Sequence, residues 1–310
     1  MKKVLSIVLC IVMVCTLCAS AFAAEKDTYV IGALMKQNAD TFVKNISDAI
    51  EAHAEELGEV VSLDLQDAEG DINKQLEQAE TMLAKGVDAV ILNAVDVDGS
   101  APIVDMCIEA GVPCIECNTL TNNVDDAACY VGSDDVDAGK IQAEFLLTVL
   151  PNDAKVCYMM GPIGVSSQIY RLDGITKYLF DVTDIEVLQS QTANWKRDEA
   201  MNLAENWLTQ YQDLDAIICQ NDDMAMGALE AAEAMDRKEG LVIVGIDAIT
   251  DAVQAVADGR LDASVFQDAA GQGAGALDVA LECAQKGLLK TEDVWIPFLP
   301  VTAENAADFM

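Results

Sequence analysis

Short apolar runs alternate along the chain with longer segments in which apolar residues recur every three or four positions. The runs are rich in β-branched residues, which is typical of buried strands. They lie at 29–34, 60–65, 89–92, 112–115, 156–160, 185–188, 216–219 and 241–246. Between them, segments such as 41–57 and 73–84 place their apolar residues on one helical stripe. This alternation predicts βαβ units whose parallel sheets are covered by helices on both faces.

Turn residues agree with this pattern. Gly86 and Gly111 each end a helical segment just before an apolar run, and Asp71 and Asp134 stand where helix N-caps are expected. The strands before about 132 and those from about 155 to 246 form two similar halves. We therefore predict an α/β fold of two doubly wound parallel-sheet domains joined by a three-segment hinge.

The boundaries of these domains follow from three passages between strand and helix, near 132, 267 and 294. We expect an N-terminal domain at 25–132 plus 268–294 and a C-terminal domain at 133–267 plus 295–310. Ligands of such sheets bind at the carboxyl ends of the strands, so two facing domains form one binding cleft.

The first residues have the composition of an export signal. Lys2 and Lys3 precede an apolar run at 4–17, and small residues ending in Ala21-Phe22-Ala23 follow it. This order is typical of a secretory signal peptide, which we place at 1–24. A membrane anchor would need about 20 apolar residues. A lipoprotein signal is the other alternative, because cysteines lie in this segment. We expect an exported protein that is periplasmic or otherwise extracytoplasmic.

The charge of the chain is strongly acidic, with 53 Asp and Glu against 18 Lys and Arg and a net charge of −35. Such a surface repels nucleic acid and anionic lipid, so we expect neither as a partner. The same charge argues against an anionic ligand.

As a separate expectation, we expect the protein to be a monomer.

Motifs for catalysis, cofactors and metals are weak. His53 is the single histidine, Cys114-x-x-Cys117 has no second cysteine pair, and the run from Gly271 to Gly275 lacks the last glycine of a dinucleotide fingerprint. We expect no metal and no cofactor, and we interpret the glycine run as close packing of a helix against a sheet or hinge. A carbohydrate-acting enzyme is the rival interpretation, in which Asp247 and Asp40 could supply an acid and base pair.

Polar and aromatic residues at strand ends and helix starts are the strongest candidates for binding. Amides, carboxylates and guanidinium groups pair with adjacent hydroxyls, and aromatic rings cover the C–H faces of a sugar. The candidate ligand-binding residues are Phe42, Asn118, Arg171, Trp195, Asn221, Asp247 and Gln267. Arg171 is the one cation expected among them.

Several segments resemble one family. The most specific are 220–228, which reads Gln-Asn-Asp-Asp-Met-Ala-Met-Gly-Ala, 244–247 and 258–261. From about Thr28 to Pro300, the chain resembles type I periplasmic binding proteins of the ribose/galactose-receptor superfamily. Segments 191–195 and 265–273 are most similar to its inositol/rhizopine-binding branch. The resemblance implies a non-enzymatic receptor that closes over a sugar or polyol and delivers it to the membrane permease of an ABC importer.

The resemblance places the seven candidate residues on ligand-facing positions, with three departures. The first loop reads Asn-Ala-Asp-Thr-Phe at 38–42 where the family carries an extra aromatic ring, Thr119 replaces an arginine, and Ile169 stands where ribose receptors place another arginine. These departures favour a neutral cyclic polyol such as myo-inositol. An inositol amine comes second, since Asp40 and Asp247 offer carboxylates, and aldoses come third. The same fold also serves chemoreceptor ligand carriers, which stay an alternative use.

Overall fold

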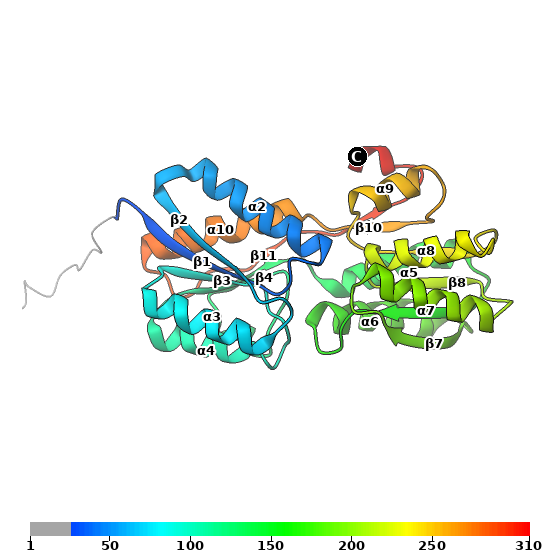
Figure 1. Cartoon of the computed structure of the whole chain (residues 1–310), viewed down its shortest axis with the longest axis horizontal. Helices are drawn as coiled ribbons and strands as arrows, with labels where there is room; N and C mark the ends of the chain where they lie inside the picture. The colour runs from blue at the N-terminus through cyan, green and yellow to red at the C-terminus, as the bar shows by residue number, and fades with distance from the viewer. Residues whose placement is uncertain (1–25) are drawn as a thin grey trace, which may run out of the picture.

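The computed structural model describes residues 26–310, and the predicted signal peptide at 1–24 lies outside the described residues. The described part of the chain forms two lobes, each an α/β layer structure, set end to end along the long axis of the molecule (Figure 1). The two-domain α/β prediction is confirmed by the two parallel sheets. Within the described part, no helix combines the length and apolarity that crossing a membrane requires.

The first lobe, called the N lobe, holds a parallel sheet in the order β11-β5-β4-β3-β1-β2. Its strands are β1 (Tyr29–Met35), β2 (Val61–Asp67), β3 (Ala89–Leu92), β4 (Cys114–Cys117), β5 (Cys129–Gly132) and β11 (Val294–Trp295). One apolar layer joins the sheet to α2 (Thr41–Leu57) and α10 (Ala269–Lys286), and a second joins it to α3 (Ile72–Lys85) and α4 (Ala101–Ala110). The sheet is therefore covered on both faces, as its continuous apolar strands predict.

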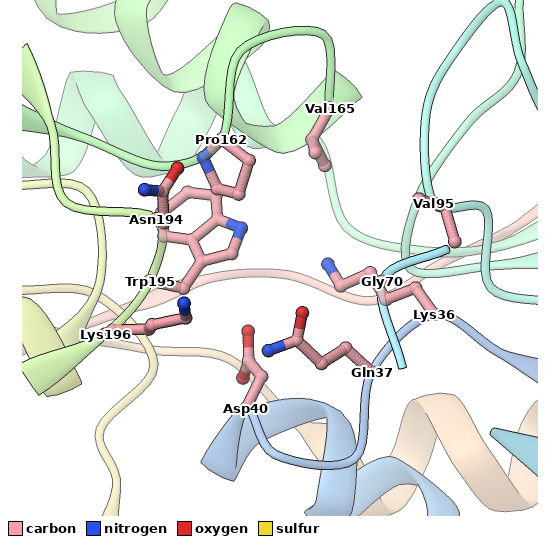
Figure 2. Close-up of a pocket in the computed structure, with 10 residues that line it drawn as sticks. All are labelled: Lys36, Gln37, Asp40, Gly70, Val95, Pro162, Val165, Asn194, Trp195 and Lys196. Carbon is pink, nitrogen blue, oxygen red and sulfur yellow. The ribbon is translucent and has the colours of Figure 1, made fainter. Parts of the chain in front are cut away.

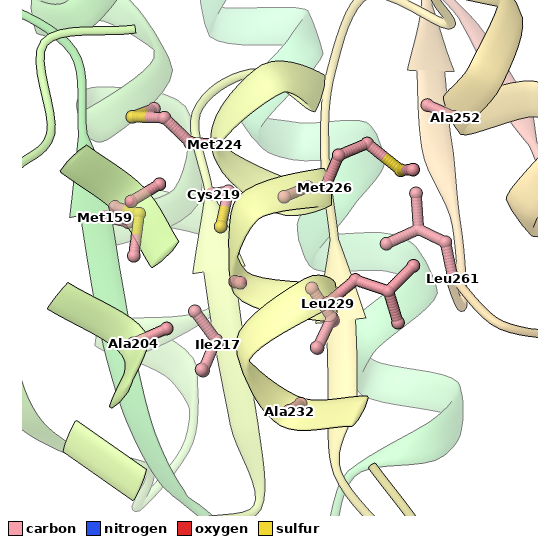
Figure 3. Close-up of a cluster of buried hydrophobic side chains, with 14 of the residues drawn as sticks. Met159, Ala204, Ile217, Cys219, Met224, Met226, Leu229, Ala232, Ala252 and Leu261 are labelled. Carbon is pink, nitrogen blue, oxygen red and sulfur yellow. The ribbon is translucent and has the colours of Figure 1, made fainter. Parts of the chain in front are cut away.

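The second lobe, called the C lobe, holds a parallel sheet in the order β7-β6-β8-β9. Its strands are β6 (Lys155–Met160), β7 (Glu186–Thr192), β8 (Ala216–Cys219) and β9 (Val242–Val244). One face packs on α5 (Asp135–Val149) and α6 (Ser166–Tyr178), and the other on α7 (Arg197–Gln210), α8 (Asp222–Ala234) and α9 (Thr250–Ala257). Figure 3 shows this second core, in which Ile217 and Cys219 of β8 face Met224 and Leu229 of α8.

The chain passes between the lobes three times. The passages lie between β5 and α5, between β10 (Ser264–Phe266) and α10, and between β11 and β12 (Leu299–Val301). β10 and β12 form an antiparallel pair beside the C lobe, and a single bridge from Val244 to Ala263 links that pair to β9. Short 3-10 helices complete the described elements: η1 (Gly58–Val60), η2 (Val124–Asp126), η3 (Phe180–Val182) and η4 (Ala306–Phe309).

Several strand boundaries differ from the sequence prediction, most of all at β7, which was expected at 185–188 and extends to Thr192, and two of the differences have clear local reasons. β4 begins at Cys114 and not at Val112, because Gly111 takes a left-handed conformation and the Val112 N–H still bonds back to Cys107 O at 2.9 Å. β9 ends at Val244, and the chain then turns through Asp247 and Ala248, which have φ of 119° and 54°. The predicted strand at 241–246 was therefore too long.

The glycine run at 271–275 opens α10, where Asp268 caps the helix by accepting from the Gly271 N–H at 2.8 Å. A Cβ atom on Gly273 would lie 2.6 Å from Ile46 O in α2. The run therefore lets α10 pack closely on α2, and its last glycine, Gly275, faces Val131 of β5, so the expected packing against a sheet is accompanied by close packing of two helices.

Candidate functional site

Two adjoining cavities lie between the lobes, where the carboxyl ends of the strands of both sheets meet. The outer cavity has a volume of about 200 Å³ and the inner one about 10 Å³, and both touch Lys36, Asp40 and Trp195. Figure 2 shows the outer cavity with side chains from both lobes around it. The inner cavity is lined by Lys36, Asp40, Phe42, Val43, Asn118, Ser167, Arg171, Trp195, Asn221 and Asp247.

Six of the seven predicted binding residues therefore line one cavity. Phe42 opens α2 and Asn118 follows β4 in the N lobe, whereas Arg171, Trp195, Asn221 and Asp247 come from the C lobe. The seventh, Gln267, does not line the cavity. Its Oε1 accepts a hydrogen bond from Arg171 Nη2 at 3.0 Å, so Gln267 lies behind the arginine.

Arg171 lies on α6 with 4% of its surface exposed, and the protein already engages its guanidinium group. It donates to Asp135 Oδ1 at 2.9 Å and to Gln220 O at 2.6 Å, besides Gln267. Burial opposes its charge, but Asp135 and Asp247 outweigh this effect and raise the pKa of Arg171. The arginine is thus a fixed cation at the floor of the cavity.

Asp247 lies just after β9, and its backbone N–H and C=O bond to Val265 O at 2.8 Å and to the Gln267 N–H at 3.3 Å. Its carboxylate is buried, lies 3.7 Å from Arg171 Nη1, and receives no hydrogen bond from the described residues. Burial raises the pKa of Asp247 well above its ordinary value, while Arg171 acts in the opposite direction. The carboxylate therefore keeps most of its accepting capacity free.

The two predicted asparagines differ in how the protein uses them. Asn118, at φ 67°, donates from Nδ2 to Gln272 Oε1 at 3.1 Å, so its amide is held inside the N lobe. Asn221 caps α8 by accepting from the Met224 N–H at 3.0 Å. Its Nδ2 has no hydrogen-bond partner within residues 26–310, which leaves a donor at the inner cavity.

Trp195 lies between β7 and α7 at φ 62°, and its ring forms a wall shared by both cavities. The Arg171 guanidinium lies 5.7 Å from the ring centroid. A Cβ atom on Gly161 would lie 2.0 Å from the ring, so only glycine leaves room for it there. The buried indole Nε1 has no partner among the described residues.

Lys36 is the functional candidate that the sequence reasoning missed. It follows β1 directly, its side chain lines both cavities, and only 7% of its surface is exposed. The expectation that Arg171 would be the one cation is therefore wrong. The sequence does contain a signal for Lys36, since it is a charged residue at the carboxyl end of a buried strand. The sequence-based candidates near this strand came from the following loop, 38–42.

Asp40 joins the site through its place at the start of α2. Its Oδ1 accepts from the N–H groups of Phe42 and Val43 at 2.9 and 3.2 Å, so it is the N-cap of the helix. Burial raises the pKa of Asp40, while Lys36 and these backbone donors lower it.

The lobes also touch beside the cavities. The Val97 N–H donates to Gly164 O at 3.0 Å, and the Leu120 N–H donates to Ser166 Oγ at 2.9 Å. Because each bond joins the two lobes, both would have to break for the lobes to separate on this side.

The remaining candidates for chemistry lie in structural settings. All seven cysteines of the described chain are buried and free, and the contact with Cys107, together with burial, raises the pKa of Cys114. His53 bonds to Asp278 at 2.7 Å and to Glu56 at 3.2 Å on the surface of α2. From residue 26 onward, no group of three His, Cys, Asp or Glu side chains is arranged to hold a metal ion.

Comparison with known proteins gives consistent matches over nearly the whole chain. The model of the periplasmic binding protein domain matches residues 31–288. A Rhizobium meliloti protein named for rhizopine binding is 39% identical over 297 residues, which are 93% of this chain and 94% of that protein. A xylitol-binding protein of Mycolicibacterium smegmatis is 32% identical over 287 residues, 92% of this chain and 80% of that protein.

A solved structure agrees with these relatives. The ABC transporter solute-binding protein of Bacillus halodurans with bound myo-inositol is similar with a TM-score of 0.88 and 34% identity, covering 93% of this chain and 99% of that one. The predicted resemblance is thus confirmed in sequence and in fold. The chain belongs to the periplasmic binding protein family, and it is a solute-binding protein and not an enzyme.

Proposed function

We propose that this protein is the extracytoplasmic receptor of an ABC importer and that it binds a neutral cyclic polyol, with myo-inositol the first choice. The observation that carries the proposal is a set of polar atoms on buried side chains at the cleft that have no hydrogen-bond partner among the described residues. They are the Asp247 carboxylate, which lies 3.7 Å from Arg171 Nη1, Asn221 Nδ2 and the buried Trp195 Nε1. Such atoms are costly to bury unbonded, and ring hydroxyls would satisfy them as donors and acceptors at once.

The chemistry of the site supports a polyhydroxylated ring. Asp247 accepts from hydroxyls, Asn221 donates to them, and the face of Trp195 offers an apolar plate for C–H groups. The similar structure from Bacillus halodurans contains myo-inositol, and the relative from Mycolicibacterium smegmatis is named for xylitol. Both ligands are uncharged polyols, which is the class that we assign to this cleft.

An aldose such as ribose, galactose or glucose is the second candidate, because the same donors and acceptors suit a sugar ring. One observation weighs against it. Thr119, which replaces the arginine of the family pattern, is turned inward and donates to Ala94 O at 3.0 Å. No guanidinium group is available at that position for a ring oxygen, and an inositol has no ring oxygen to engage.

We infer a hinge mechanism from the origin of the lining residues. Phe42 and Asn118 come from one lobe and four others from its neighbour, so a ligand between them favours the closed form. The inner cavity of about 10 Å³ has room for about one water molecule, so a ring can enter only if the lobes move. We propose that the moving bodies are 25–132 with 268–294 and 133–267 with 295–310.

We further propose that the closed protein docks on the membrane permease of the importer and works as a monomer. Family membership supports a place of action outside the cytoplasm, consistent with a signal peptide at 1–24 and a periplasmic or cell-surface location. A chemoreceptor is the alternative partner, since it would read the same closed form.

The function is tested by mass spectrometry of any ligand released from the purified protein, followed by calorimetric titration with myo-inositol, ribose, galactose and glucose. We expect one myo-inositol per chain and weaker binding of the aldoses. Tight binding of an aldose without binding of myo-inositol would contradict the polyol assignment. Conversion of a bound polyol to a product would contradict the assignment as a receptor.

A further inference from the structure

Lys36 occupies a position in the cleft that its backbone fixes firmly. Its C=O accepts from the Gly70 N–H at 2.7 Å, and its N–H donates to Asn93 Oδ1 at 3.3 Å. The side chain extends from the end of β1 into the space between the lobes and points toward Trp195 (Figure 2). The backbone therefore holds Lys36 in place, and its side chain is directed into the cavity and not toward the protein surface.

The ammonium group of Lys36 differs from the other cations that line the two cavities, Arg171 and Lys196, in having no fixed partner; Lys196 pairs with Glu199 at 2.8 Å. Arg171 is engaged by Asp135, Gln220 and Gln267. Lys36 Nζ, by contrast, makes no hydrogen bond and no ion pair with any residue that the structure describes, although 93% of the residue is buried. Among these cations, the one that remains free to bind a ligand is therefore Lys36.

The nearby carboxylates are already offset by other groups. Asp40 accepts from two backbone N–H groups at the start of α2, and Asp247 lies 3.7 Å from Arg171. Burial lowers the pKa of Lys36 and Arg171 acts in the same direction, whereas Asp40, Asp135 and Asp247 raise it without cancelling the effect of burial. A second positive charge in this space would meet an unpaired ammonium in a medium of low dielectric constant, where like charges repel more strongly than in water.

We propose that Lys36 is a specificity-determining residue that makes the cleft select neutral polyols over amino-polyols of the same ring. Lys36 Nζ donates to a ring hydroxyl of the neutral ligand and repels an ammonium group placed within the cavity. The proposal rests on the polyol-binding function proposed above. It also reverses the sequence-based expectation of an inositol amine as second choice, which counted Asp40 and Asp247 but not the lysine.

The net negative charge of the protein acts against the proposed selection for neutral ligands. With 53 acidic and 18 basic residues, the long-range field of the chain attracts cations. Any preference against an amine must therefore arise inside the cleft, and it will persist at high salt because buried charges are screened much less than exposed ones.

The test is calorimetric titration of the purified protein with two matched ligands, scyllo-inositol and 1-amino-1-deoxy-scyllo-inositol, which differ by one hydroxyl replaced by an ammonium group. At pH 7 and 0.15 M salt, we expect the wild-type protein to bind the neutral ring at least tenfold more tightly. Lys36→Met removes the charge and should shrink that ratio at least tenfold. Lys36→Arg keeps a cation and should keep the preference for the neutral ring.

Two results would overturn the inference while leaving the receptor function intact: equal binding of both rings by the wild-type protein, or an unchanged ratio in a folded Lys36→Met variant. If Lys36→Met does not fold, the inference is still tested by the affinity ratio of the two rings in the wild-type protein and in Lys36→Arg. Loss of the preference for the neutral ring in Lys36→Arg would then contradict it. A wild-type protein that binds neither ring nor myo-inositol, but binds an aldose, would reject the proposed polyol function itself.

Discussion

Two clusters of buried polar side chains in this protein differ in how completely they are hydrogen-bonded. The first, called the N-lobe network, lies behind the cleft and consists of Gln75, Asn93, Ser100 and Thr119, each at most 1% exposed. Gln75 donates to Asn93 O at 2.9 Å, Ser100 donates to Gln75 Oε1 at 2.8 Å, and Asn93 donates to Thr119 Oγ1 at 3.1 Å. Every member therefore has a protein partner.

The second cluster, at the cleft, includes Trp195, Asn221 and Asp247, which are at most 7% exposed and each keep a polar atom without a hydrogen bond from the described residues. Burial alone does not distinguish the two clusters. Native proteins bond nearly all buried polar groups, and each exception costs about 1–3 kcal/mol. A single exception such as Trp207 Nε1 in the C-lobe core also occurs. What marks a binding site is the convergence of several exceptions on one cavity.

The largest expected effect is on affinity, from Asp247→Asn. Asparagine tolerates the positive φ of this position, so the backbone should be kept while the charge is lost. We expect binding of myo-inositol to weaken by about 2–4 kcal/mol, as for other buried charged hydrogen-bond partners. The unliganded protein should not lose stability, because an unbonded buried carboxylate is removed. Calorimetry and thermal unfolding measure the two effects. Unchanged affinity with a lower Tm would make Asp247 a turn residue.

The next effect should appear on stability alone, from Gln75→Met in the N-lobe network. Methionine has a similar shape but leaves Asn93 O and the Ser100 hydroxyl without their partner. We expect the free energy of unfolding to fall by about 1–3 kcal/mol, with affinity for myo-inositol within twofold of wild type. Denaturant titration measures the first quantity. A large loss of affinity here would erase the distinction between the two clusters.

A smaller effect on affinity is expected from Gly161→Ala. The added Cβ would lie 2.0 Å from the Trp195 ring, so the ring must shift from the cavity wall. We expect binding to weaken by about 1 kcal/mol, the usual worth of an aromatic contact beyond its buried area. Gly275→Ala is the matched control, because its Cβ would make an ordinary contact at 3.5 Å with Val131. Equal affinity of both variants and wild type would exclude Trp195 as a ligand contact.

The smallest effect concerns pH and a bonded acid of the N lobe. Glu116 is fully buried and accepts from the Thr121 N–H at 2.9 Å, yet burial raises its pKa to about 7. The folded state therefore holds more protons than the unfolded state between about pH 4.5 and 7, so stability falls as pH rises through this window.

We expect Glu116→Gln to flatten the pH dependence of stability by an amount on the order of 1 kcal/mol between pH 5 and 8. Thermal unfolding across that range, with wild type as reference, measures the change. Asp222, whose pKa burial raises to about 8, should retain its own contribution in the variant. An identical slope in wild type and variant would show that Glu116 does not titrate there.

The fold and most of the site were predictable because both follow from local periodicity. Strands such as 89–92 and 216–219 were predicted to the residue, since apolar runs bounded by turn residues have few other solutions. Asn118, Asn221 and Asp247 were found because the carboxyl ends of parallel strands meet at one edge. β5, Cys129–Gly132, was missed as an element although it has the same length as β3 and β8.

The bonding of the site was not predictable from the chain. Arg171 donates hydrogen bonds to Asp135, Gln220 and Gln267, which are 36 to 96 residues away in sequence. Lys36 is unbonded because its neighbours happen to be engaged elsewhere. Whether a polar atom is free depends on tertiary neighbours, which residue types and spacing do not specify.

The most direct test of the central claim is a crystal structure of the protein with myo-inositol. The account predicts one ring between the lobes, with hydroxyls in hydrogen-bond contact with the Asp247 carboxylate and Asn221 Nδ2 and with a C–H face against Trp195. A ring bound elsewhere, or bound in the cleft with Asp247 and Asn221 still lacking partners, would contradict it.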